Sequence, residues 1–394
     1  MKFKFIIFLF TLCLGLAGCS KENNEPEVKP KRTVLAYIIA NNSLSSFATG
    51  NLKSMIESAS DKNLNGGNLL VYYAQRNELP RLLRIEETKE NINQSDVLKG
   101  YIEEHTIKTY DSQNAVDPEI MQSIIRDAVT LAPADSYGLV LWSHGTSWFP
   151  SNLNSMLRAF GQDGSNWMEI DQLAQGIPDH FFDFILFDAC YMANIECAYE
   201  LKDKADYILA SPTETMGTGW PYSVIMPYFF TETAQLDKAG EAFYNYYNVM
   251  SGDYRTATVS LVKTSELDNL ANIVKEILSD KSEDDLYGLD RSSASMQRLE
   301  YLYKSGSYNP VLLYDFNDFI SQLATPEQYT RFTAGMKNAI IYEAHTETAY
   351  FGNPQQSFPI NRCSGLSVYV PAENYPKINA WYQEHLKWYK AVYK

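Results

Sequence analysis

The sequence predicts an α/β fold built on a mostly parallel central sheet. Its strongest features are short apolar runs rich in β-branched and aromatic residues, which are typical of strands buried on both faces of a sheet. These runs alternate along the chain with helix-like stretches, and such alternation indicates strand–helix–strand units. Four runs carry most of this pattern: Thr33–Ala40, Asn68–Ala74, Tyr137–Trp142 and Phe184–Phe187.

The first half of the folded region is predicted to hold two strong strands, two weaker strands and two helices. The pair Asp117-Pro118 indicates a helix start, because aspartate caps a helix and proline fits its first turn. In chain order we expect strand 33–40, helix 44–60, strand 68–74, peripheral strands 81–87 and 105–110, and helix 118–131.

The second half continues the alternation and then becomes mixed. The run 206–210 is apolar like the earlier strands, and 256–262 alternates between apolar and polar residues, which also predicts a strand. In order we expect strand 137–142, helix 168–177, strand 184–187, helix 194–204, strand 206–210, helix 234–250, strand 256–262, helices 265–279, 315–323 and 326–341, and strand 365–370.

Two long polar segments follow strands of the predicted sheet. Residues 146–168 are rich in serine, asparagine, glycine and aspartate, and loops of that length are usually functional or disordered. Residues 211–222 are punctuated by glycine and proline and follow strand 206–210. Sites in open α/β sheets collect beyond the carboxyl ends of strands, so both segments are expected to border the functional site.

The N-terminus has the features of an export signal. Two early lysines precede the apolar stretch Phe5–Leu16, which is too short to span a membrane comfortably as a retained helix. Leu16-Ala17-Gly18-Cys19 resembles the lipobox of bacterial lipoproteins. We therefore expect removal of residues 1–18 and lipidation of Cys19; an ordinary secretory peptide cut nearby is the alternative. Acyl chains on Cys19 would anchor the protein to a bacterial membrane, in our expectation the outer one, through the polar tether 19–32.

The composition and net charge limit the classes of protein to which this chain could belong. The 394 residues are 45% hydrophobic and 21% charged, an ordinary globular balance, and suggest two or three structural units. The formal net charge of −15, without a basic patch, argues against nucleic-acid binding.

The cysteines point to a free thiol. Of five, Cys13 leaves with the signal and Cys19 would carry lipid, so three remain. An odd number in an exported protein favours a reactive thiol over a disulfide framework. Cys190 follows a strand and, with a helix expected to begin near Tyr191, would have a lowered thiol pKa. Cys197, in a helix, and Cys363, in a loop, are interpreted as structural.

His144 is the natural partner of that thiol. Among five histidines it alone ends a predicted buried strand, and Gly145 allows a sharp turn after it. Alone it would be interpreted as a structural histidine, but Cys190 lies 46 residues later at another strand end, and together they suit a nucleophile and its base. No G-x-S-x-G elbow supports a serine hydrolase, and no HExxH motif supports a zinc enzyme.

Several segments around this pair resemble the clostripain family of cysteine peptidases, and the likeness extends from about residue 33 to residue 371. The segments are Leu139-Val-Leu-Trp-Ser-His-Gly145, Phe187-Asp-Ala-Cys-Tyr-Met192 with Glu196 and Tyr199-Glu-Leu201, Gly217-Thr-Gly-Trp-Pro-Tyr222, and Gly365-Leu-Ser-Val-Tyr-Val-Pro371.

The resemblance implies a caspase-like α/β/α sandwich and cleavage of proteins or peptides after arginine or lysine. We expect a catalytic domain at 33–255 and an α/β region at 256–394 that packs on it and extends it. By the same likeness Cys190 would be the nucleophile and His144 the general base and acid, with backbone N–H groups near Gly145 binding the oxyanion.

The resemblance also suggests which residues bind substrate. Asp188 would pair with a basic P1 side chain in the S1 pocket, although a carboxylate favoured at a helix start is the alternative. The segment around Thr218 offers none of the further acid that sharply basic-specific members carry, so Glu214 is the nearest second acid. We also include Gly145, Thr218 and Trp220 among the expected substrate-binding residues.

Activation and cofactors follow from the resemblance too. Self-cleavage between the His and Cys strands is common in the family, and residues 146–168 hold one basic residue, so we expect a cut after Arg158. No cofactor is needed for the chemistry. Calcium is a possible requirement: Asp163 and Asp171 are available, but no EF-hand spacing exists. We expect a monomer; the alternative to a peptidase is a caspase-like surface lipoprotein that binds without turnover.

Overall fold

A nine-stranded sheet runs through the part of the chain that the structure describes, in the order β12-β10-β9-β8-β5-β1-β2-β3-β4. This computed structural model describes residues 30–150, 159–300 and 312–394. The signal peptide, Cys19, most of the tether and Arg158 therefore lie outside the described residues.

The sheet is parallel at its centre and antiparallel towards both edges. Strands β9, β8, β5, β1 and β2 run parallel, whereas β3, β4, β10 and β12 pair antiparallel with their neighbours. The strand bounds are β1 Arg32–Ala40, β2 Asn68–Gln75, β3 Arg81–Ile85, β4 Thr106–Thr109, β5 Ser136–Trp142, β8 Phe182–Asp188, β9 Ala205–Ala210, β10 Thr258–Lys263 and β12 Ile340–His345.

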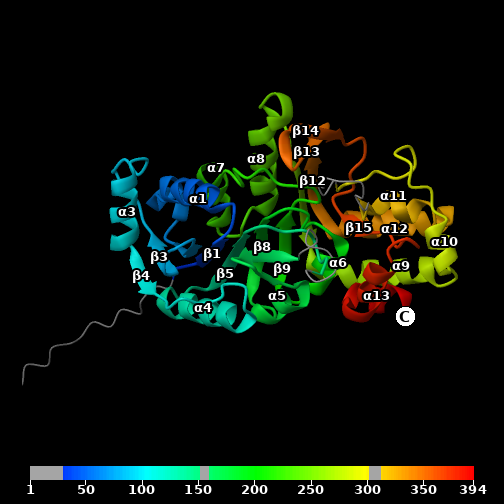
Figure 1. Ribbon diagram of the computed structural model, residues 1–394, viewed down its shortest axis with the longest axis horizontal. Coiled ribbons are helices and arrows are strands. Elements are labelled where there is room, and N and C mark those ends of the chain that lie inside the picture. The colour runs from blue at the N-terminus through cyan, green and yellow to red at the C-terminus, as the bar shows by residue number, and fades with distance from the viewer. Residues whose placement is uncertain (1–29, 151–158, 301–311) are drawn as a thin grey trace, which may run out of the picture.

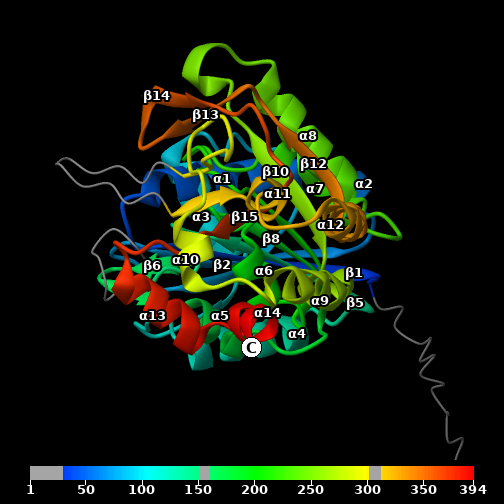
Figure 2. The ribbon, with the colours of Figure 1, turned by 90° about the vertical axis from the view of Figure 1, so that its right-hand side faces the viewer.

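Helices cover both faces of this sheet (Figures 1 and 2), which confirms the predicted α/β sandwich. Because side chains alternate along a strand, Leu35 and Tyr37 of β1 pack towards one helix layer and Val34 and Ala36 towards the other. One layer contains α1 Ser45–Ser58, α3 Ser95–Glu104, α7 Tyr222–Phe229 and α8 Leu236–Asn248. The other contains α4 Pro118–Leu131, α5 Ile170–Gly176, α6 Ile195–Glu200 and α9 Leu267–Leu278.

Smaller elements surround the sandwich. Three short antiparallel pairs lie outside the main sheet: β6 Phe160–Asp163 with β7 Asn166–Met168, β11 Leu313–Asp315 with β15 Ser367–Tyr369, and β13 Thr348–Phe351 with β14 Asn353–Pro359. The remaining helices are α2 Asp61–Leu64, α10 Glu283–Tyr287, α11 Phe316–Ser321, α12 Pro326–Ala339, α13 Pro376–His385 and α14 Lys387–Tyr393, with 3₁₀ turns η1 Gly252–Tyr254 and η2 Thr264–Glu266.

Several sequence predictions differ from the structure. The helix expected to run to residue 341 ends at Ala339, and the β-branched and aromatic side chains from Ile340 onward join the sheet as β12. The expected strand 365–370 is observed as β15, but it pairs with β11 instead of the main sheet. The helix predicted for 194–204 ends at Glu200.

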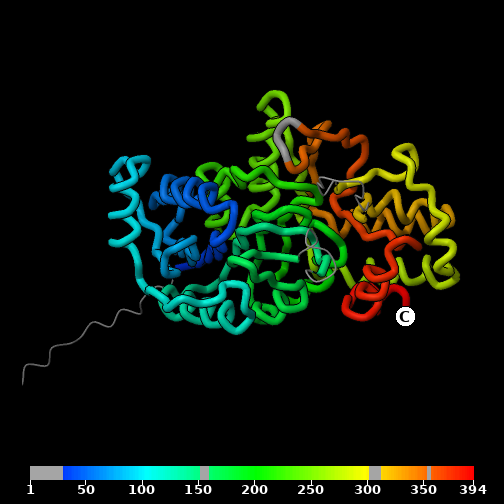
Figure 3. Tube along the Cα trace, viewed as in Figure 1, coloured from blue at the N-terminus to red at the C-terminus, as the bar shows by residue number. Residues whose placement is uncertain are grey.

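Residues beyond 256 do not form a separate layer. They supply β10 and β12 to one side of the main sheet, and β10 pairs directly with β9. The tube in Figure 3 shows this part of the chain, in yellow to red, lying against the sheet and its helices. No helix within the described residues is long and apolar enough to cross a bilayer.

Candidate active site

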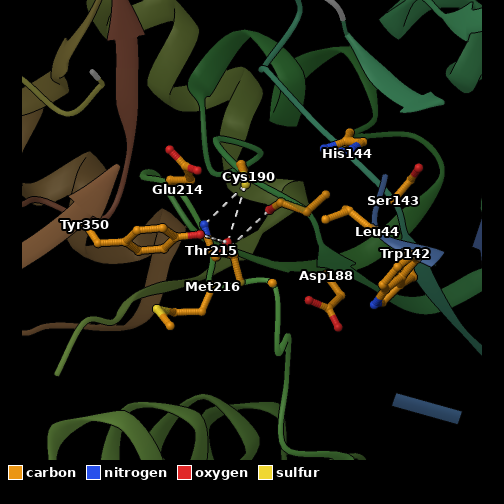
Figure 4. A pocket seen from close by; sticks show the side chains of 12 residues that line it. Leu44, Trp142, Ser143, His144, Asp188, Cys190, Glu214, Thr215, Met216 and Tyr350 are labelled. Carbon is orange, nitrogen blue, oxygen red and sulfur yellow. Dashed lines mark hydrogen bonds between the residues drawn. The ribbon is translucent and has the colours of Figure 1, made fainter. Parts of the chain in front are cut away.

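The candidate site lies at the carboxyl ends of β5 and β8, which are neighbours in the sheet. Trp142, the last residue of β5, stands beside Asp188, the last residue of β8. His144 and Cys190 each follow two residues later, so the parallel register brings them to the same place. Both line one pocket of about 90 Å³ (Figure 4).

Cys190 lies in a turn and not at a helix N-terminus. Tyr191 after it has a left-handed backbone (φ +61°), and helix α6 begins only at Ile195, capped by the Asn194 side chain. The predicted helix start near Tyr191 was therefore wrong, and the helix dipole does not act directly on this sulfur. Its nearest polar partner is the Thr215 backbone, whose N–H donates to Sγ at 3.3 Å and whose carbonyl accepts from the thiol at 3.6 Å.

The surroundings of Cys190 favour the neutral thiol in this conformation. Burial, followed by the negative charge of Glu214, raises the pKa of the Cys190 thiol well above its ordinary value. The Thr215 N–H opposes this effect, but it is the smaller contribution. A thiolate would therefore need a change around the sulfur, such as water entry, imidazole contact or neutralisation of Glu214.

His144 is half-buried at the end of β5 and contacts the loop that follows β1. Its Nε2 lies 2.9 Å from the hydroxyl oxygen of Ser43. The adjacent Asn42 fixes that loop, because its amide donates to the carbonyl oxygens of Ile39 and Gln162. The ring of Trp167, from β7, lies 6.1 Å from the imidazole. The imidazole is thus positioned by the ends of two parallel strands and one hairpin.

Gly145 allows the two strand-end loops to approach closely. A Cβ at this position would lie 2.8 Å from the carbonyl oxygen of Cys190 and 3.1 Å from the Ala189 side chain. Any larger residue would push the Cys190 turn away from the His144 loop. This close approach accounts for a glycine directly after the histidine.

Asp188 is a buried carboxylate that lines the pocket. Its Oδ2 accepts hydrogen bonds from the Tyr222 hydroxyl at 2.7 Å and the Trp220 N–H at 3.1 Å. Burial raises its pKa to about 6, which these two neutral donors only partly offset. Gly219, with φ +67°, crosses directly over it, and a Cβ there would lie 2.6 Å from Oδ2. The pocket therefore holds a carboxylate whose charge is poorly compensated.

The segment after β9 contributes Glu214 to the pocket but turns two other predicted residues away from it. Thr218 is exposed and its hydroxyl lies 2.9 Å from that of Tyr247. Trp220 is fully buried and stacks on Phe243 with ring centroids 4.0 Å apart. Neither is among the residues that line this pocket.

Other residues line the pocket without having been singled out from the sequence. Leu44 follows the end of β1, so the strand-end rule that led to His144 would also have found it. Met216 lies two residues after Glu214. Tyr350 comes from the β13–β14 hairpin far along the chain, and no local sequence pattern places it here.

The two residues considered for calcium lie in different surroundings. Both carboxylate oxygens of Asp163 accept hydrogen bonds from within the protein. The donors are the Asn41 side-chain amide at 2.7 Å and the Ala115 N–H at 2.6 Å. Asp171 lies in the first turn of α5. Within the described ranges no group of three or more His, Cys, Asp or Glu side chains could hold a metal ion, so Asp163 and Asp171 belong to no such group, and a calcium requirement stays a prediction.

The cysteines outside the pocket bear on the choice of nucleophile. Cys190, Cys197 and Cys363 are all free thiols. Cys197 is buried within α6 beside Ser147, and burial raises its pKa far above the ordinary value. Cys363 also has a pKa raised by burial and does not line the pocket. Cys190 lines the same pocket as His144, and neither of the other two thiols lines that pocket.

Known proteins are similar to this chain in architecture and in sequence. The clostripain family profile matches residues 36–394. Clostripain from Hathewaya histolytica is 24% identical over 422 residues, covering 89% of this chain and 79% of that protein. The crystal structure of an inactive zymogen protease from Parabacteroides distasonis is 40% identical, with a TM-score of 0.80 and coverage of 93% of this chain and 99% of that one.

A further structural neighbour contains a peptide-derived ligand. It is a secreted cysteine protease from Bacteroides thetaiotaomicron in complex with an irreversible peptide inhibitor. It is 30% identical, has a TM-score of 0.75, and the match covers 92% of this chain and 98% of that one. The family profile spans nearly all of the folded chain, and the fold and sequence agree with it throughout. The chain therefore belongs to the clostripain family and is a clostripain-like cysteine peptidase.

Proposed function

We propose that this peptidase is an endopeptidase that cleaves after arginine or lysine with a His144/Cys190 dyad. The observation that carries the proposal is the β5–β8 register, which delivers His144, Cys190 and the buried Asp188 to one pocket. These three residues supply a base, a nucleophile and a binding partner for a cationic side chain.

The chemistry follows from the positions of these groups. His144 takes the proton of the Cys190 thiol, and the sulfur attacks the scissile carbonyl carbon to form a tetrahedral adduct. Backbone N–H groups near Gly145 and Cys190 would stabilise its negative oxygen. The adduct collapses to a thioester as the imidazolium gives its proton to the departing amine. Water, deprotonated by the imidazole, then releases the acid product and restores the thiol.

Asp188 accounts for the preference at P1. A buried carboxylate without a cationic partner gains most from a guanidinium or ammonium group that enters its pocket. A bound cation would also hold Asp188 ionised at a pH where burial otherwise favours its protonated form. A neutral P1 side chain would leave the buried carboxylate unpaired.

The neutral thiol supports a latent form that requires activation. Cys190 is bonded to the Thr215 backbone, and a related protein of similar fold is an inactive zymogen. We propose self-cleavage within residues 146–168, after Arg158. Mass spectrometry of the purified active protein should detect that cut, and an intact, fully active protein would contradict it.

Export and anchoring complete the proposal. The apolar N-terminal stretch and the lipobox-like Leu16–Cys19 support signal removal and lipidation of Cys19, and one relative is a secreted protease. The mature chain would then act on peptide or protein substrates at a membrane surface, as a monomer. Metabolic labelling with a fatty acid should mark the wild type and not Cys19→Ala.

Fluorogenic peptides ending in arginine or lysine test the dyad directly. We expect the wild type to cleave them under reducing conditions, and Cys190→Ala to lose activity completely. Cys363→Ala is the matched control, because it removes another free thiol outside the pocket and should keep wild-type activity. No activity in the processed wild type, with or without calcium, would overturn this proposal and favour a surface lipoprotein that binds without turnover.

A second experiment tests whether Asp188 binds the basic P1 side chain. Asp188→Asn should lower kcat/KM for arginine substrates by at least about 30-fold, since loss of a buried charge partner costs about 2 kcal/mol or more. For the wild type the same parameter should rise as the pH passes about 6, where Asp188 ionises. Unchanged arginine cleavage by Asp188→Asn would remove Asp188 from this role.

A further inference from the structure

The pocket contains a second carboxylate, Glu214, on a different side of the nucleophile from Asp188. Figure 4 shows Glu214 and His144 on opposite sides of Cys190, and Asp188 below the line that joins them. A P1 side chain that reaches Asp188 therefore leaves Glu214 for another part of the substrate. Glu214 therefore faces a side chain of the substrate other than P1.

Glu214 is held in place by neutral donors only. Its Oε2 accepts from the Gly352 N–H at 2.9 Å and from the Tyr191 hydroxyl at 3.2 Å. It takes part in none of the ion pairs found among the described residues. Burial raises its pKa to about 7, although the side chain is half-buried and more accessible to solvent than that of Asp188. A cationic group is the chemical class that such a site would bind.

The direction of the substrate follows from the proposed chemistry. His144 gives its proton to the departing amine, so the departing half of the substrate lies on the His144 side of Cys190. Glu214, on the other side, faces the half that becomes the thioester. The P2 side chain, next to P1 in that half, is the first substituent that could reach it.

Neighbouring groups suit a basic P2 side chain. Glu214 directly precedes Thr215, whose backbone faces the Cys190 sulfur, so an extended substrate beside Thr215 passes Glu214. Tyr350 also lines the pocket and is anchored by its hydroxyl, which donates to the Thr215 carbonyl at 2.9 Å. A tyrosine ring beside a carboxylate is a favourable environment for a guanidinium or ammonium group.

We propose that Glu214 binds a basic P2 side chain, so that preferred cleavage sites carry two consecutive basic residues. The inference rests on the proposed function, because it assumes that P1 occupies the Asp188 side of the pocket. It assigns the two carboxylates separate positions of the substrate. Sites with one basic residue are then cleaved at a basal rate.

Binding at Glu214 would also favour the reactive form of the nucleophile. The charge of Glu214 is the second cause, after burial, of the raised Cys190 pKa. A P2 cation beside Glu214 offsets that charge and thereby lowers the cost of forming the thiolate. A basic P2 residue should consequently increase kcat as well as lower KM.

Matched peptides test the proposal. All carry arginine at P1 and a fluorogenic leaving group, and P2 is arginine, lysine, glutamine or norleucine. For the wild type we expect kcat/KM to be about tenfold higher with a basic P2 than with norleucine, which corresponds to about 1.4 kcal/mol. Glu214→Gln should abolish this preference, so that its kcat/KM is the same with a basic P2 as with norleucine; because the substitution also removes the charge that raises the Cys190 pKa, the readout is this ratio within the variant and not the absolute rate.

Glu347→Gln is the control for a lost negative charge. Glu347 lies close in sequence to the β13–β14 hairpin, is exposed, and pairs with Arg255. This variant should retain the full P2 preference, and thermal melting should show that both variants are folded. A P2 preference that persists in Glu214→Gln, or its absence from the wild type, would overturn the inference.

The outcomes separate this inference from the proposed function. If the processed wild type cleaves arginine and norleucine P2 peptides equally, the dyad and P1 proposals stand and only the role of Glu214 is lost. If it cleaves no P1-arginine peptide, the proposed function fails and the role of Glu214 falls with it.

Discussion

Ser43 and His144 form a contact that can select the reactive nitrogen of the imidazole. If the Ser43 hydroxyl accepts from Nε2–H, the proton is fixed there and Nδ1 is left with the lone pair that a base needs. The bond is exposed to solvent, so its contribution is at most about 1 kcal/mol. Ser43 is a positioning residue in this interpretation, since it contacts the imidazole and does not itself line the pocket.

Substitution of Ser43 tests that role. Ser43→Ala should lower kcat about fivefold with little change in KM, because it loosens the base without altering the substrate pocket. Ser43→Thr restores a hydroxyl and should recover most of the rate. Ser46→Ala, an exposed position on α1, is the matched control. A Ser43→Ala enzyme with unchanged kcat would show that the contact has no part in turnover.

At the residue scale the sequence predicted His144, Cys190 and Asp188 because each follows or ends a strongly apolar strand. It did not predict the turn at Cys190, since Tyr191 adopts a left-handed backbone without being glycine. Tyr350 was also beyond prediction. It reaches the pocket only through the packing of a hairpin whose strands have no strong apolar pattern.

At the element scale the central strands were predictable and the late connections were not. Strands β1, β5 and β8 are continuously apolar because both of their faces are buried. In contrast, α12 runs into β12 without an intervening turn, and only the partner strand β10 decides where the helix ends. The β6–β7 hairpin was missed because its strands span only four and three residues, within a segment rich in serine, asparagine, glycine and aspartate.

Helix α6 carries a buried acid whose protonation should affect stability. Glu196 is fully buried, its Oε1 accepts from the Tyr369 N–H at 3.0 Å, and its Oε2 has no hydrogen-bond partner among the described residues. Burial raises its pKa from the ordinary 4.5 to about 8. The folded protein therefore binds this proton more tightly than the unfolded chain does.

The sign of the pH effect follows from that difference. The stabilisation is fully present below pH 4.5 and is lost as the pH rises through about 8. In urea unfolding, Glu196→Gln should remove this contribution, so the wild type should lose on the order of a few kcal/mol relative to the variant between pH 5 and pH 8.5. Glu119→Gln, in the first turn of α4, is the control and should follow the wild type. Parallel pH profiles for wild type and Glu196→Gln would contradict the prediction.

At the scale of the whole molecule, the predicted boundary at residue 255/256 divides a continuous sheet. Strand β10 covers the edge of β9, and β15 lies beside the Asn194 turn that begins α6. One hydrophobic core extends from Leu35 in β1 to Val392 in α14. The sequence predicted that the C-terminal region extends the catalytic domain, but local patterns could not show how much of the core it shares.

Because the region beyond residue 256 shares this core with the rest of the fold, we predict that the chain beyond residue 30 unfolds as one unit. Ending the chain at residue 255 would uncover the backbone of β9 and the apolar surface that α9 and α14 cover, including Tyr199, whose ring packs edge-on against Trp388. It would also remove Lys387, whose Nζ pairs with the buried Glu200 at 3.1 Å. We expect a single thermal transition for the 30–394 chain, detected alike by near-ultraviolet and far-ultraviolet circular dichroism, and an aggregating 30–255 fragment. A soluble fragment with its own cooperative transition would instead establish 33–255 as an independent domain.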